Sequence, residues 1–170
     1  MSDPTRTSYG ELNPAAPAEL QAFAFLIGKW DGTGRTRVPD GSVAEFPVTW
    51  IGRYILDGMA IGDEVHAPAP DGTPYMGITF RHYDRTRHTW IVEYLNVTGS
   101  FLRRQVDTER GSVEVSGKEV IVASASPGIT ILERYIVPDH DHFTYRLDVS
   151  QDGGKSWTQG QIEMTFERLE

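Results

Sequence analysis

The sequence contains no cysteine among its 170 residues, which excludes disulfide frameworks, thiol nucleophiles, iron–sulfur clusters and cysteine-ligated zinc. Long apolar runs are also missing: the longest, residues 23–27, is far shorter than the ~20 residues that cross a bilayer. Positive charge is scarce, since 16 basic against 24 acidic residues give a net charge of −8. Such a chain binds nucleic acid poorly unless its cations cluster.

The N-terminal residues are polar and rich in proline and alanine, and they lack the apolar core of a signal peptide. We therefore expect a cytoplasmic protein that contacts neither membrane nor nucleic acid. The length favours one domain, and we predict a flexible tail over residues 1–16 and a single domain over residues 17–170. Whether the chain forms a homodimer is left open by the sequence.

One short helix is predicted over residues 18–27, directly after Pro17, because proline is favoured at a first helical turn. Its apolar positions are Leu20, Phe23, Ala24 and Ile27, which share one face of a helix with 3.6 residues per turn. Gly28 follows and ends it. The predicted helix therefore has a single face to bury.

The rest of the chain alternates turn pairs such as Asp40-Gly41 and Asp71-Gly72 with runs rich in β-branched and aromatic residues. This alternation of turn dipeptides and strand-forming runs is typical of short antiparallel strands. A long meander hides its edges by closing into a barrel or splitting into a sandwich. The predicted strands are residues 29–38, 43–51, 54–66, 74–82, 88–96, 100–107, 112–116, 119–124, 129–137, 142–150 and 156–168.

Loop lengths predict which residues pair across the central hairpins. A loop over residues 83–87 would pair His82 with His88, Phe80 with Trp90, and Met76 with Tyr94. A loop over residues 97–99 would pair Val92 with Arg104. Each pairing can slip by one residue, and a slip turns the opposite side chains inward.

A loop over residues 138–141 would pair Tyr145 with Arg134, so that Arg134 and Arg104 both lie on apolar inner faces. A buried guanidinium needs a partner. Either an inward carboxylate, Asp57 or Glu133, pairs with it for stability, or the arginines bind the anionic or carbonyl end of a ligand.

The segment Gly28-Lys29-Trp30-Asp31-Gly32-Thr33-Gly34 resembles the opening of calycin-like domains, in which a helix leads into a Gly-Xaa-Trp-Xaa-Gly-Xaa-Gly strand. Residues 77–84 and 152–168 resemble two hairpins of the same lipocalin-like bacterial family of unknown function. The family is distantly similar to the nitrobindins. This resemblance implies an all-β, up-and-down antiparallel barrel of about ten strands with a short N-terminal helix and an interior cavity.

The nitrobindin likeness also implies a haem held by a histidine late in the chain. The late histidines here, His140 and His142, fall in a predicted turn, and we predict no cofactor and no metal. His82 and His88 would face each other, with His66 and Glu64 nearby, but a zinc site needs three or four ligands. We weigh a solvated hairpin end against a ligand-contacting histidine at the barrel mouth.

The basic residues concentrate at Arg81, Arg85, Arg87, Arg103 and Arg104. Tyr83 and Phe101 lie among them, a mixture that can bind nucleic acid. The net charge of −8 opposes that interpretation. We therefore predict a solvated rim.

The first functional hypothesis is a site in the barrel lumen for a small hydrophobic or aromatic ligand, with a carboxylate or carbonyl at its polar end. The second is a cofactor-free lyase, isomerase, hydratase or cyclase, in which Arg134 stabilises an oxyanion and Tyr145, Tyr94 or His82 moves a proton. A haem protein is third. The predicted lumen residues are Trp50, Met76, Ile78, Phe80, Trp90, Val92, Tyr94, Leu132, Tyr145 and Met164, with Arg104 and Arg134 as polar contacts.

Overall fold

Eleven strands form one antiparallel sheet in a computed structural model that describes residues 7–38, 40–68, 74–98, 101–105, 112–126 and 128–169. At residues 97–98, 101–105 and 126 only the backbone is described. The elements are η1 (Ala18–Leu26), β1 (Gly28–Arg37), β2 (Val43–Ile55), β3 (Ala60–Pro68), β4 (Pro74–Asp84), β5 (Thr89–Thr98), β6 (Phe101–Gln105), β7 (Ser112–Ser116), β8 (Glu119–Ser126), β9 (Ile129–Ile136), β10 (His142–Ser150) and β11 (Thr158–Leu169).

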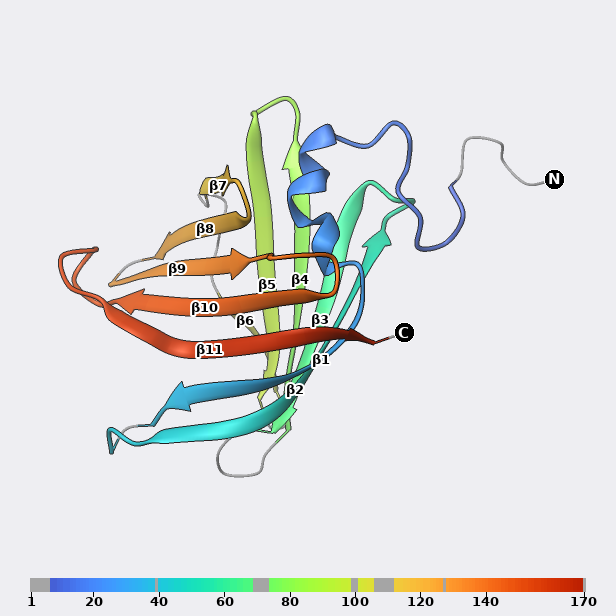
Figure 1. The fold of residues 1–170 in the computed structure, drawn as a ribbon. Helices are drawn as coiled ribbons and strands as arrows, with labels where there is room; N and C mark the ends of the chain where they lie inside the picture. The colour runs from blue at the N-terminus through green and yellow to red at the C-terminus, as the bar shows by residue number, and fades with distance from the viewer. Residues whose placement is uncertain are drawn as a thin grey trace.

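The sheet curls into a nearly closed barrel (Figure 1). Its strand order is β6-β5-β4-β3-β2-β1-β11-β10-β9-β8-β7, so strands that follow one another in the chain pair, except β6 and β7, and β1 also pairs with β11. β6 and β7 form the two edges, and β5 approaches β7 across the remaining gap. The predicted all-β antiparallel barrel with a short N-terminal helix is confirmed.

The helix η1 contacts β2, β3 and β4 and lies at one end of the barrel (Figure 1). It is a 3₁₀ helix, and its buried residues Leu20, Phe23 and Leu26 are spaced by three, as a helix with three residues per turn requires. The predicted inner face, which included Ala24 and Ile27, assumed 3.6 residues per turn. Leu26 takes the place of Ile27, which is already extended.

The predicted strand over residues 54–66 is wrong, because a tight turn divides it. Leu56, Asp57 and Gly58 all adopt positive φ angles of 51°, 58° and 76°, and β3 begins only at Ala60. Asp57-Gly58 is therefore a hairpin turn, a class of dipeptide that favours this conformation. Asp57 consequently lies in the turn and not inside the barrel.

Part of the predicted tail lies against this turn. The Thr7 backbone N–H donates to the Asp57 carboxylate at 2.8 Å, and the Asn13 amide donates to the Asp57 carbonyl at 3.0 Å. Arg85 donates to the carbonyl of Ala15 at 2.9 Å. The described part of this segment is therefore docked on the barrel, while its predicted flexibility remains a prediction.

The register between β4 and β5 differs from the prediction. Tyr83 pairs with Trp90, Arg81 with Val92, and Thr79 with Tyr94. The Asp84 carboxylate accepts hydrogen bonds from the N–H groups of Thr86 and Arg87 at 2.8 and 3.1 Å, which closes a shorter loop than predicted. As a result the inner face of β4 carries Tyr75, Thr79, Arg81 and Tyr83 rather than the more apolar set Met76, Ile78 and Phe80.

The register between β9 and β10 is one residue from the prediction. Tyr145 pairs with Tyr135 and Leu147 with Glu133, while Arg134 pairs with Arg146. Because side chains alternate along a strand, this slip exchanges the two faces of β9. Glu133 and Tyr135 point into the barrel, and Arg134 points away from it.

Candidate functional site

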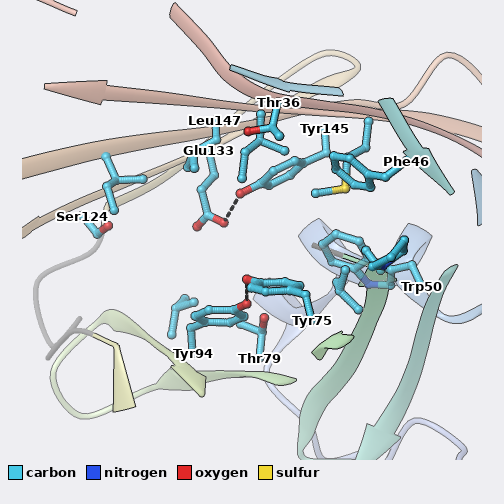
Figure 2. A pocket seen from close by; sticks show the side chains of 17 residues that line it. Thr36, Phe46, Trp50, Tyr75, Thr79, Tyr94, Ser124, Glu133, Tyr145 and Leu147 are labelled. Carbon is cyan, nitrogen blue, oxygen red and sulfur yellow. Dashed lines mark hydrogen bonds between the residues drawn. The ribbon is translucent and has the colours of Figure 1, made fainter. Parts of the chain in front are cut away.

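The barrel holds a cavity of about 310 Å³, a size at the lower end of small-molecule sites. Aromatic and aliphatic side chains make most of its wall, and a few polar groups project into it (Figure 2). The lining residues are Thr36, Phe46, Trp50, Val65, Ala67, Pro68, Tyr75, Thr79, Val92, Tyr94, Ser124, Ile131, Glu133, Tyr145, Leu147, Ile162 and Met164.

Glu133 is the one charged side chain among the described residues that line this cavity. The Tyr145 hydroxyl donates to its carboxylate at 2.9 Å. Burial raises the pKa of Glu133 above its usual value, against the lowering effect of the Arg81 charge and of hydrogen bonds from Tyr145 and Tyr135. The cavity therefore contains a carboxyl group that holds its proton more tightly than an exposed one.

A second polar pair lies opposite. The hydroxyls of Tyr75 and Tyr94 are hydrogen-bonded to each other, and they face Glu133 and Tyr145 across the cavity, with Thr79 beside them (Figure 2). Burial, together with the charge of Glu133, raises the pKa of Tyr75 to about 12. Tyr75 is therefore a neutral hydrogen-bonding group at physiological pH.

Behind the cavity, a buried network connects Glu133 to the helix end of the barrel. Arg81 is 1% exposed and forms an ion pair with Asp63, itself 1% exposed. Arg81 also donates to the Tyr135 hydroxyl at 3.0 Å, and its guanidinium lies 5.0 Å from the centre of the Phe23 ring. Arg81 is therefore held through its two terminal nitrogens, while its buried Nε has no hydrogen-bond partner among the described residues.

Several predicted lumen residues lie where expected. Trp50, Val92, Tyr94, Tyr145 and Met164 all line the cavity. Their contact with a ligand remains a prediction.

Other predicted lumen residues lie elsewhere. Trp90 is buried in the core, with its ring 5.0 Å from that of Phe23. Met76, Ile78, Phe80 and Leu132 occupy the face of the sheet opposite the cavity because of the two register differences, and Met76 is 38% exposed.

Arg134 corrects the central sequence prediction. It pairs with Glu119 at 3.2 Å and with Asp148 at 3.5 Å on the outer face of the sheet. Although burial raises the pKa of Asp148, hydrogen bonds from Arg146 and from the Gly160 N–H, with the charges of both arginines, bring it below its usual value. Neither Asp57 nor Glu133 partners Arg134. The Arg104 side chain lies outside the described residues, and its backbone pairs with Leu95 rather than Val92.

We expect Arg134→Leu to lower the free energy of unfolding by less than ~1 kcal/mol, the usual range for ion pairs near the surface. Asp148 keeps its hydrogen bonds from Arg146 and Gly160 at 2.7 and 2.8 Å, so no charge is stranded. Denaturant unfolding measures the change. A loss above ~3 kcal/mol would contradict the outward placement of Arg134.

His82, His88 and His66 do not form a common site in the structure. His82 pairs with Ile91 and is exposed, while His88 lies in the following turn with a positive φ of 52°. His66 lies 3.4 Å from Glu64 on the outer face. Within the described ranges no group of three or more potential ligands is placed to hold a metal ion.

The residues present do not fit the haem that the nitrobindin likeness implies. His140 and His142 lie at the exposed β9–β10 turn, where they contact Asp141 and Asp139 at 2.7 and 2.8 Å. None of the described residues that line the cavity is a histidine.

The predicted basic rim is only partly present. Arg85 is bound to Ala15, and Arg87 lies 3.7 Å from Asp84. Arg81 is buried inside the barrel and does not contribute to a surface. The side chains of Arg103 and Arg104 lie outside the described residues.

Tyr75 and Thr79 were missed as cavity residues, Glu133 was considered only as an inward partner of an arginine, and Arg81 was assigned to the surface. The signal that could have placed the β4 residues is the sequence Asp84-Arg85-Thr86-Arg87, because an aspartate side chain often closes a turn by accepting N–H groups two and three residues later. That turn fixes the register and hence the inner face of β4.

Together the fold and cavity define a class: a nearly closed antiparallel β-barrel with an internal, mostly apolar cavity. No family model matches the sequence, and no curated protein matches it. Similar solved structures include the following two. Rv2717c from M. tuberculosis is 16% identical, with a TM-score of 0.58 over 91% of this chain and 99% of that one. The S-type phycobiliprotein lyase CPES from Guillardia theta is 11% identical, with a TM-score of 0.52 over 91% and 94%.

At these identities the likeness establishes the barrel fold. No helix in the described part of the chain is long and apolar enough to cross a membrane.

Glu133 should make the stability depend on pH. Because its folded-state pKa is raised, the folded protein binds more protons than the unfolded chain between the unfolded pKa of ~4.3 and the raised value. The contribution of Glu133 to stability is therefore fully present below that window and is lost as the pH rises through it. In Glu133→Gln this loss should disappear, as shown by unfolding curves of both proteins from pH 4 to pH 8. If the free energies of unfolding of wild type and Glu133→Gln change with pH in the same way, the prediction is contradicted.

Proposed function

We propose that the protein binds a small, mostly apolar aromatic molecule in its barrel cavity. The observation that supports this most directly is the composition of the wall: aromatic and aliphatic side chains from both halves of the sheet surround a few polar groups gathered around Glu133. Sites for small molecules commonly have this arrangement. The fold likeness to a phycobiliprotein lyase is consistent with small-molecule binding.

The volume suits a compact ligand. A cavity of ~150 Å³ accommodates benzene, and this one measures about 310 Å³. One or two fused rings with a short substituent would fill it. Trp50, Tyr145 and Tyr94 would provide the ring contacts.

The test uses a neutral probe, 2-naphthylmethanol, with calorimetry as the readout. Ala67 is a small residue on the cavity wall, and Ala67→Phe should fill the space and abolish binding. The matched control is His66→Phe on the outer face of the same strand, which should bind the probe as wild type does. Undiminished binding by a folded Ala67→Phe variant would show that the probe binds elsewhere.

A second candidate function is general acid–base catalysis in the same cavity, favoured by the raised pKa of Glu133 and its hydrogen bond to Tyr145. A carboxyl with a raised pKa is a stronger base than an exposed carboxylate and can return the proton it accepts. Glu133 would take a proton next to a substrate carbonyl, and Tyr75 or Tyr94 would donate a hydrogen bond to the oxygen. Exchange of the α-protons of 2-tetralone with solvent deuterium, lost in Glu133→Gln, tests this candidate.

A further inference from the structure

The ionisable side chains that line the cavity are acidic, and none of the described ones is basic. Glu133 contributes a carboxyl. The remaining polar side-chain groups of the wall are the Trp50 indole N–H, which is buried without a hydrogen-bond partner among the described residues, and hydroxyls from Tyr75, Tyr94, Tyr145 and residues of the serine and threonine type. Hydroxyls donate and accept hydrogen bonds without charge. The described wall therefore offers an acidic group with no basic side chain beside it.

The nearest guanidinium does not serve as that cation. Arg81 is held by Asp63 and by the Tyr135 hydroxyl, which lies 3.0 Å away, and Arg81 is not part of the cavity wall. Its charge acts on Glu133 through space, but Arg81 is already paired with Asp63 and does not reach the wall. A ligand carboxylate placed near Glu133 would meet like charge without a compensating base among the described residues.

The aromatic rings of the wall also favour a positively charged ligand group. Tyr75 and Tyr94 lie across the cavity from Glu133, with the Tyr145 ring beside Glu133 (Figure 2). The face of an aromatic ring carries partial negative charge and attracts cations. A cationic group between Glu133 and these rings is stabilised from both sides.

We propose that the ligand is an aromatic amine whose protonated nitrogen is held by Glu133 opposite the Tyr75–Tyr94 pair. The proposal rests on the proposed function and specifies the polar end of the ligand. An ammonium group has three N–H donors and no acceptor, so it can donate to the Glu133 carboxylate and to a tyrosine hydroxyl together. The sequence alone had indicated an anionic or carbonyl end, because it placed Arg134 inside the barrel.

Three probes with the same ring system separate the possibilities: 2-naphthylmethylamine, 2-naphthylmethanol and 2-naphthoate, measured by calorimetry at pH 7. We expect the amine to bind at least tenfold more tightly than the alcohol, and the carboxylate to bind most weakly. Equal or tighter binding of the carboxylate would overturn the inference while leaving the proposed function standing. Binding of none of the three would overturn both.

The variant Glu133→Gln keeps the shape of the side chain and removes its charge. It should bind the alcohol as wild type does and lose the tenfold preference for the amine. Arg134→Leu is the matched control, since Arg134 is the next residue on β9 and faces outward; it should bind all three probes normally. A Glu133→Gln variant that keeps the preference would overturn the proposal.

A measurement on the wild-type protein covers the case in which Glu133→Gln does not fold. The ionisable groups around Glu133 are Tyr145, Tyr135, Tyr75 and the Arg81–Asp63 pair. Of these, Glu133 is the group whose charged form a neighbouring ammonium would favour, so amine binding should lower the pKa of Glu133. Across a pH series, binding of the amine should therefore release protons wherever Glu133 of the free protein is partly protonated, seen as a dependence of the calorimetric heat on the buffer's ionisation enthalpy. If the amine releases no more protons on binding than the alcohol does, the proposal is contradicted.

Discussion

Replacing Arg81 by methionine is expected to lower the free energy of unfolding by about 3–5 kcal/mol, which makes it one of the two most damaging single changes we predict. Arg81 and Asp63 form an ion pair in which each residue is only 1% exposed. The variant leaves the Asp63 carboxylate buried without its partner. It also removes the hydrogen bond to Tyr135 and the guanidinium above the Phe23 ring.

Denaturant unfolding of three variants identifies the cause. In the double variant Arg81→Met/Asp63→Leu both charges are gone, and replacing a buried pair by apolar side chains is often neutral, so most of the stability should return. Arg35→Met is the surface control, because Arg35 pairs with Glu163 while 63% exposed, and it should cost less than ~1 kcal/mol. A double variant no more stable than Arg81→Met would show that the loss comes from packing and not from a stranded charge.

The barrel was predictable because its signals are local. Turn dipeptides and β-branched runs mark most strands within a few residues, and Pro17 marks the start of the helix. The failures are also local in origin. Asp57-Gly58 was not recognised as a turn, so two strands were joined into one. In the helix, the stripe Leu20, Phe23 and Leu26 follows a period of three that an α-helical pattern does not anticipate.

The site was less predictable because it depends on register. On β4 the outward residues Met76, Ile78 and Phe80 are more apolar than the inward Thr79 and Arg81, so hydrophobicity selects the wrong face. On β9 a one-residue slip exchanges Arg134 for Glu133. That single exchange reverses the sign of the charge expected in the cavity. Residues on strands whose register was not in question, Trp50 and Met164, were placed correctly.

The second large effect is expected for Phe23→Ala, which should also lower the free energy of unfolding by about 3–5 kcal/mol. Phe23 is completely buried and joins the helix to the barrel. Its ring lies 5.0 Å from Trp90 and 6.1 Å from Tyr135, edge to face in both cases, and 5.0 Å from the guanidinium carbon of Arg81. Alanine leaves a hole that these neighbours cannot fill, because each is held by its own strand.

Phe25→Ala is the matched control on the same helix. Phe25 is only partly buried, although its ring lies 5.6 Å from Tyr135 and 5.5 Å from Phe143. The Phe25→Ala variant should therefore lose less free energy of unfolding than Phe23→Ala in the same denaturant titration. If the two variants lose equal free energy of unfolding, the burial of Phe23 against the Arg81–Asp63 pair contributes no stability beyond that of an ordinary aromatic contact. A larger loss for Phe23→Ala means that the helix stabilises the end of the barrel where Arg81 and Asp63 are buried.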